Sequence, residues 1–136
     1  MIVDTSALLA LFNSREPRHG DVTDALASAD DEPFVVSPYV LAELDYLVAG
    51  RVGVQAELAV LAELSGGGWE LPPFDGDDLK AAARLIAKYA DQEIGLADAS
   101  QVVLAHRYAT RTIATLDRKH FSVLRPMNGG RFTLLP

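Results

Sequence analysis

Two aspartates directly follow apolar segments that have the character of β-strands. Asp4 comes after Ile2-Val3, and Asp117 comes after the strand-like segment that ends at Leu116. In open α/β sheets, ligands bind at the carboxyl ends of the strands, so both carboxylates are candidate site residues. Each also has an ordinary alternative role, because aspartate is a preferred helix cap and a common turn residue.

Glu43 and Asp98 are candidates because each is expected on the apolar side of a helix. Glu43 stands three residues after Val40 and four before Leu47, on a second helical turn that is too deep for capping. A buried carboxylate needs a basic partner or a metal, and this helix offers no Lys or Arg before Arg51. Asp98 falls in the first turn of its helix, where a favourable interaction with the helix dipole is the alternative explanation.

Together, the four acids predict a metal site. In a doubly wound sheet, strand ends and the helix starts that follow them meet at one edge. Four carboxylates in one cleft repel each other unless cations lie between them. Oxygen-only ligands suit Mg²⁺ or Mn²⁺, and such ions commonly hold a water for attack on a phosphodiester. The pattern therefore indicates hydrolysis of nucleic acid.

Composition narrows the class of protein. The chain has 136 residues, 49% of them hydrophobic, which predicts one globular domain spanning residues 1–136. It contains no cysteine, which excludes a disulfide framework, a thiolate zinc site, an iron–sulfur cluster and a cysteine nucleophile. No apolar run approaches the ~20 residues that span a bilayer, and no signal peptide is recognisable, so we expect a cytoplasmic protein without membrane contact.

Charge is distributed unevenly along the chain. The net charge is −7, yet the segment 105–136 carries +5 and the preceding residues carry −12. Arg118 and Lys119 directly follow Asp117 in this basic segment and are predicted to contact RNA phosphates. A solvated basic face is the alternative. At position 120, next to this pair, we expect a surface histidine.

Strand and helix patterns alternate along the whole chain. Strands are predicted over residues 1–3, 34–36, 69–71, 112–116 and 132–135. Helices are predicted over residues 7–12, 17–29, 37–50, 54–64, 77–89 and 96–108, with Gly50 as a C-cap. This alternation predicts an α/β fold with a parallel sheet covered on both faces.

Four short motifs resemble those of PIN-domain ribonucleases. They are Met1–Ser6 (MIVDTS), Glu43, Gly95–Ala99 (GLADA) and Thr115–Asp117 (TLD). The length and the phrase ATLDRKHF at 114–121 resemble VapC toxins of bacterial toxin–antitoxin systems. The resemblance covers essentially the whole chain.

The resemblance implies an α/β/α sandwich with a mainly parallel, five-stranded sheet and Mg²⁺- or Mn²⁺-dependent endoribonuclease activity. It also implies a tRNA or rRNA substrate, inhibition by a VapB-type antitoxin, and a homodimer. Asp4, Glu43, Asp98 and Asp117 would be the catalytic, metal-binding acids, with Thr5, Ser6 and Thr115 as supporting hydroxyls. A noncatalytic PIN-like module that binds RNA or protein is the alternative. A phosphatase with an aspartate nucleophile is disfavoured, because Ser6 stands where its second aspartate would be.

Overall fold

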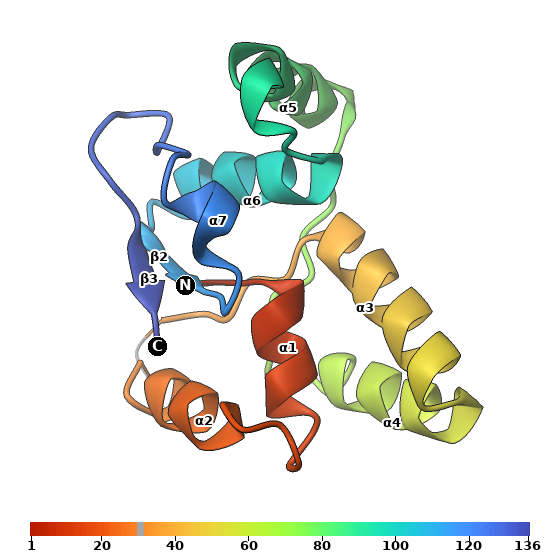
Figure 1. The fold of residues 1–136 in the computed structure, drawn as a ribbon. Coiled ribbons are helices and arrows are strands. Elements are labelled where there is room, and N and C mark those ends of the chain that lie inside the picture. Colours follow the sequence, from red (N-terminus) through yellow and green to blue (C-terminus); the bar gives the residue numbers. More distant parts are fainter. Residues whose placement is uncertain (30–31) are drawn as a thin grey trace.

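A short parallel sheet forms the centre of the computed structural model, which describes residues 1–29 and 32–136 (Figure 1). Within those residues the sheet has three strands, β1 (Ile2–Val3), β2 (Thr112–Ala114) and β3 (Thr133–Leu135), in the order β1-β2-β3. Val3 lies opposite Ala114, and Ala114 lies opposite Leu135. The α/β class with a parallel sheet is therefore confirmed.

The predicted five-stranded sheet is wrong in its number of strands. Segment 34–36 lies beside β1 and segment 69–71 lies beside segment 34–36, but they form only isolated parallel bridges, Ile2 with Val35 and Val35 with Glu70. Neither segment can extend further, because Pro38 begins a helix and Pro72-Pro73 has no amide hydrogens for a ladder. All five expected extended segments are therefore present and run parallel to one another, but two of them pair over too few residues to count as strands.

Six of the described helices agree with the predicted ones to within a few residues, and the structure adds a short helix and a 3₁₀ turn that were not predicted. In the described part of the chain they are α1 (Thr5–Leu11), α2 (His19–Ala27), α3 (Pro38–Arg51), α4 (Val54–Leu64), α5 (Gly76–Lys88), the 3₁₀ turn η1 (Ala90–Gln92), α6 (Leu96–Arg107) and α7 (Arg118–Phe121). Gly50 is not a C-cap but lies inside α3. The turn falls instead at Gly53, whose φ of 113° suits glycine and which precedes α4. No helix among these is long and apolar enough to cross a membrane.

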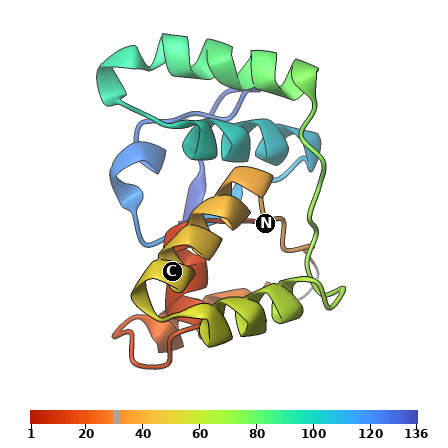
Figure 2. The same ribbon diagram turned by 90° about the vertical axis from the view of Figure 1, so that its right-hand side faces the viewer.

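Helices cover the sheet on both faces (Figures 1 and 2). Successive residues of β1 alternate between the faces: Val3 belongs to a buried cluster with side chains of α1–α4, and Ile2 belongs to a second cluster with α5–α7. In β2, Ala114 and Ile113 divide in the same way. This alternation is the period-two geometry of strands, and it fixes the sheet between two helical layers.

Candidate active site

All four predicted acids line one pocket of about 270 Å³. Asp4 follows β1, Asp117 follows β2, Asp98 lies in the first turn of α6, and Glu43 lies on α3. The remaining lining residues are Thr5, Ser6, Leu9, Leu47, Ala97, His120 and Phe121. Elements far apart in the sequence thus bring the acids to one edge of the sheet.

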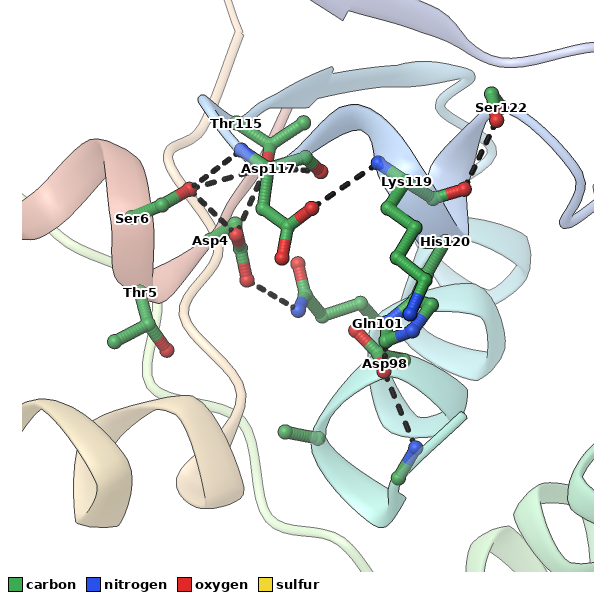
Figure 3. Close-up of polar contacts among 12 residues, drawn as sticks. Asp4, Thr5, Ser6, Asp98, Gln101, Thr115, Asp117, Lys119, His120 and Ser122 are labelled. Atoms are coloured by element: carbon green, nitrogen blue, oxygen red, sulfur yellow. Dashed lines mark hydrogen bonds and ion pairs between the residues drawn. The ribbon is translucent and has the colours of Figure 1, made fainter. Parts of the chain in front are cut away.

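Asp4 is held by three side-chain donors (Figure 3). The hydroxyls of Ser6 and Thr115 each donate to its Oδ2 at 2.8 Å. The amide nitrogen of Gln101 donates to its Oδ1, also at 2.8 Å. Asp4 stands at the N-cap position of α1, but its side chain makes no capping bond to that helix among the described residues. Its carboxylate is therefore committed to the pocket.

Ser6 joins the start of α1 to the end of β2. Its oxygen accepts the backbone N–H of Leu116 at 2.9 Å and that of Asp117 at 3.2 Å. The N–H of Asp117 also lies 3.1 Å from the hydroxyl of Thr115. One small side chain thus fixes the backbone that carries Asp117 relative to the carboxylate of Asp4.

Glu43 lines the pocket but is exposed, so the predicted burial in the apolar stripe of α3 is wrong. The buried residues of that helix are Val40, Leu44 and Val48, four residues apart, and Glu43 lies on the flank of the stripe that they form. The hydroxyl of Thr5 donates to Glu43 Oε2 at 2.5 Å. The long side chain, directed by this bond, lets an exposed helix position reach the pocket.

Asp98 is partly buried in the first turn of α6. Burial raises its pKa, and the charge of Asp4 raises it further. Two contacts with Asp98 Oδ2 oppose that rise: the N–H of Gly95 donates to it at 3.2 Å, and Nδ1 of His120 lies 2.9 Å away. The prediction that His120 is a surface residue is wrong, because α7 places its side chain in the pocket.

Asp117 is exposed and acts as the N-cap of α7, where its Oδ1 accepts the N–H of Lys119 at 3.0 Å. It is thus a helix cap, rather than the turn residue that was the alternative, and it also lines the pocket. Of the two predicted RNA contacts, Lys119 is exposed, whereas the guanidinium of Arg118 donates to the backbone carbonyl of Pro136. Arg118 therefore binds the residue that follows β3.

Gln101, which was not predicted from the sequence, lies behind the pocket and binds one of its acids, Asp4. It is fully buried on α6, and its Oε1 finds no hydrogen-bond partner within residues 1–29 and 32–136. Leaving a buried acceptor unpaired costs about 1–3 kcal/mol. The available signal was its position three residues after Asp98, on the same side of an apolar helix.

The donor chemistry of the pocket fits a hard divalent cation. Four carboxylates line it, and its described lining includes no Lys or Arg side chain that could neutralise them. Oxygen ligands of this kind suit Mg²⁺ or Mn²⁺. No three acidic or imidazole groups of the described residues are already drawn together as a finished ligand set.

Comparisons with known proteins agree on one family. A family model described as "PIN domain" matches residues 1–125. The chain is 62% identical to ribonuclease VapC26 of Mycobacterium tuberculosis over 136 residues, which is the full length of both chains.

Solved structures share the fold. VapC20 of Mycobacterium tuberculosis, described as a sarcin-ricin loop cleaving toxin, superposes with a TM-score of 0.77 at 24% identity, covering 85% of this chain and 88% of that one. VapBC2 of Rickettsia felis, bound to a promoter DNA fragment, gives a TM-score of 0.69 at 18% identity, covering 98% and 95%. DNA-bound VapBC of Salmonella typhimurium gives 0.72 at 16% identity, covering 98% and 96%.

Proposed function

Because this chain belongs to the PIN-domain family and is a VapC-type ribonuclease toxin of a VapBC toxin–antitoxin system, we propose that its four-acid pocket is the active site. The observation that supports this proposal most directly is that four separate parts of the fold bring Asp4, Glu43, Asp98 and Asp117 to one pocket. A noncatalytic module, the alternative, is disfavoured by full-length identity of 62% to a ribonuclease.

The four acids would hold Mg²⁺ or Mn²⁺. A cation bound there supplies an activated water and stabilises charge on the leaving oxygen of a phosphodiester. Ser6 and Thr115 keep the Asp4 carboxylate oriented, since both hydroxyls donate to the same oxygen. Thr5 directs Glu43 into the pocket. These hydroxyls therefore act by fixing the ligands, in keeping with the general importance of groups that orient metal ligands.

The substrate is RNA, and we assign its phosphate contact chiefly to Lys119. This exposed cation follows Asp117 directly, at the edge where the scissile phosphate would lie. Arg118 would contribute less, because it binds the carbonyl of Pro136. A structured loop of tRNA or rRNA is the proposed substrate class, supported by the sarcin-ricin loop that VapC20 cleaves.

A VapB-type antitoxin is the proposed protein partner. Next to the acidic pocket, and sharing Ser6, Leu9 and Leu47 with it, lies a larger cavity of about 600 Å³ between α1, α3 and α4. Val52, an exposed apolar side chain at the end of α3, is among the residues that line it. Exposed apolar surface of this kind marks protein interfaces, and its position would let one partner cover the active site as well.

Three further proposals concern organisation. Residues 1–136 would form one PIN domain, because β3, which follows the matched region 1–125, completes the same sheet. The protein would act as a homodimer, which its mass in solution would test. It would work in the cytoplasm, where its RNA substrate is found.

The active-site proposal is tested with purified protein and a structured RNA. Cleavage should stop in EDTA and return when Mg²⁺ or Mn²⁺ is restored. Asp4→Asn should abolish cleavage while the protein stays folded, whereas Asp91→Asn should not, because Asp91 is an exposed acid in η1 outside the pocket. Unchanged cleavage in chelator, or an active Asp4→Asn variant, would contradict the proposal.

A further inference from the structure

The proposed role of the four acids does not explain why a buried glutamine, Gln101, lies beside them. It lies fully buried on α6 beside the buried residues Val102 and Leu104. An apolar side chain would satisfy that environment without leaving an acceptor unpaired. The amide therefore has a use other than packing, and its single described contact, with Asp4, shows where to look.

The chemistry of the contact fixes the orientation of the amide. Asp4 carries only acceptors when ionised, so the Gln101 group facing its Oδ1 at 2.8 Å must be the donating NH₂. The reverse orientation would set two acceptors against each other. Oε1 is consequently turned away from Asp4 and remains without a donor among the described residues.

Gln101 completes the restraint on Asp4. Ser6 and Thr115 both bind Oδ2, so they leave Oδ1 free to swing about that point. The bond from Gln101 is the side-chain contact that the described residues provide to Oδ1. In Figure 3 it approaches from the α6 side of the pocket, opposite Ser6. With it, both oxygens of the carboxylate are held in place.

We propose that Gln101 is a positioning residue for cation binding, which holds Asp4 in the orientation that a divalent ion needs. Its Oε1, which has no partner among the described residues, would be left to accept a hydrogen bond from a water. This inference rests on the proposed active site and adds to it a fifth residue, one that acts through Asp4.

Wild-type protein permits a first test by NMR. The chain has five side-chain amides, at Asn13, Gln55, Gln92, Gln101 and Asn128, so their ¹⁵N signals can be followed individually. During a Mg²⁺ titration the Gln101 amide should shift in step with the backbone amide of Asp98. Gln92 is a built-in control, because its Nε2 donates to Asp91 at 3.0 Å outside the pocket. A Gln101 signal that stays still while Asp98 shifts would overturn the inference.

A matched pair of variants gives the second test. Gln101→Met keeps the size of the side chain and removes its hydrogen-bond donor. We expect the Mn²⁺ dissociation constant of this variant, measured by calorimetry, to be about 10–100-fold higher than that of wild type. Gln92→Met should bind Mn²⁺ as wild type does. A merely structural role for Gln101 would change thermal stability without this loss of affinity.

The outcomes separate the two proposals. If wild-type protein binds Mn²⁺ and Gln101→Met binds it equally well, only the role of Gln101 is refuted. If wild-type protein binds neither Mg²⁺ nor Mn²⁺, the active-site proposal fails and takes this inference with it. Should Gln101→Met not fold, the titration of wild-type protein decides alone.

Discussion

Ser6→Ala tests whether the Ser6 hydroxyl fixes the positions of Asp4 and Asp117 in the proposed active site. The substitution removes a bond to Asp4 and two acceptor contacts for backbone N–H groups. Asp117 keeps the hydroxyl of Thr115 as an acceptor at 3.1 Å, whereas Leu116 loses the acceptor that the described residues give it. The structure therefore predicts one newly unpaired N–H and one weakened carboxylate restraint.

The expected magnitude follows from that count. Leaving the partly buried N–H of Leu116 unpaired costs about 1–3 kcal/mol of unfolding free energy. For a domain of this length the loss corresponds to a melting temperature lower by roughly 4–12 °C. Because Asp4 and the backbone of Asp117 also lose a shared anchor, activity should fall by about 10–100-fold, as is typical when a group that orients metal ligands is removed.

Thermal unfolding in the absence of metal measures the first effect, and RNA cleavage at saturating Mg²⁺ measures the second. Ser65→Ala is the matched control, because its hydroxyl is exposed and donates to the carbonyl of Ala62. That variant should stay within about 0.5 kcal/mol of wild type. If Ser6→Ala melts with wild type and cleaves RNA at the wild-type rate, the role assigned to Ser6 is refuted.

Three further outcomes can be checked. Burial holds the pKa of Asp98 above its unfolded value of about 3.9, so the ionised group lowers stability increasingly as pH rises through the folded-state pKa. Asp98→Asn should therefore raise the metal-free melting temperature at pH 7, with a gain that shrinks towards pH 4, and should abolish cleavage; a lower melting temperature at pH 7 would contradict this. Lys119→Ala in an Asp4→Asn background should make the salt dependence of RNA binding shallower by roughly one unit, whereas Arg118→Ala should change the slope less and lower stability, because it releases the carbonyl of Pro136. Val52→Asp should weaken antitoxin binding, measured by calorimetry, by at least about tenfold and leave free-toxin cleavage intact; an undiminished affinity would move the partner to another face.

The sequence was informative where a site residue directly follows a strand. Asp4 and Asp117 could be placed because the strand ends before them set their position in any parallel sheet. Glu43 was placed in the site for a mistaken reason, since it is exposed and reaches the pocket from the flank of α3. Periodicity identifies the buried stripe of a helix, but it does not tell a residue inside that stripe from one beside it.

Contacts between distant elements could not be read from local patterns. Gln101 meets Asp4 across 97 residues, and no spacing rule connects them. His120 depends on α7, a four-residue helix that is too short for a periodic signal and is started by the cap at Asp117. The excess of predicted strands has a similar cause, because an extended segment forms a strand only where neighbouring backbone can pair with it beyond one bridge.

The four acids differ in how firmly the protein holds them. Asp4 is nearly buried and receives three side-chain donors, and Asp98 has Gly95 and His120 against its carboxylate. Glu43 and Asp117 are exposed, so water screens their charges, and each retains one described donor. Repulsion is thus offset by hydrogen bonds in the interior and by solvent at the rim. A cation in this pocket would therefore meet two carboxylates fixed in the interior and two that lie at the solvent-exposed rim.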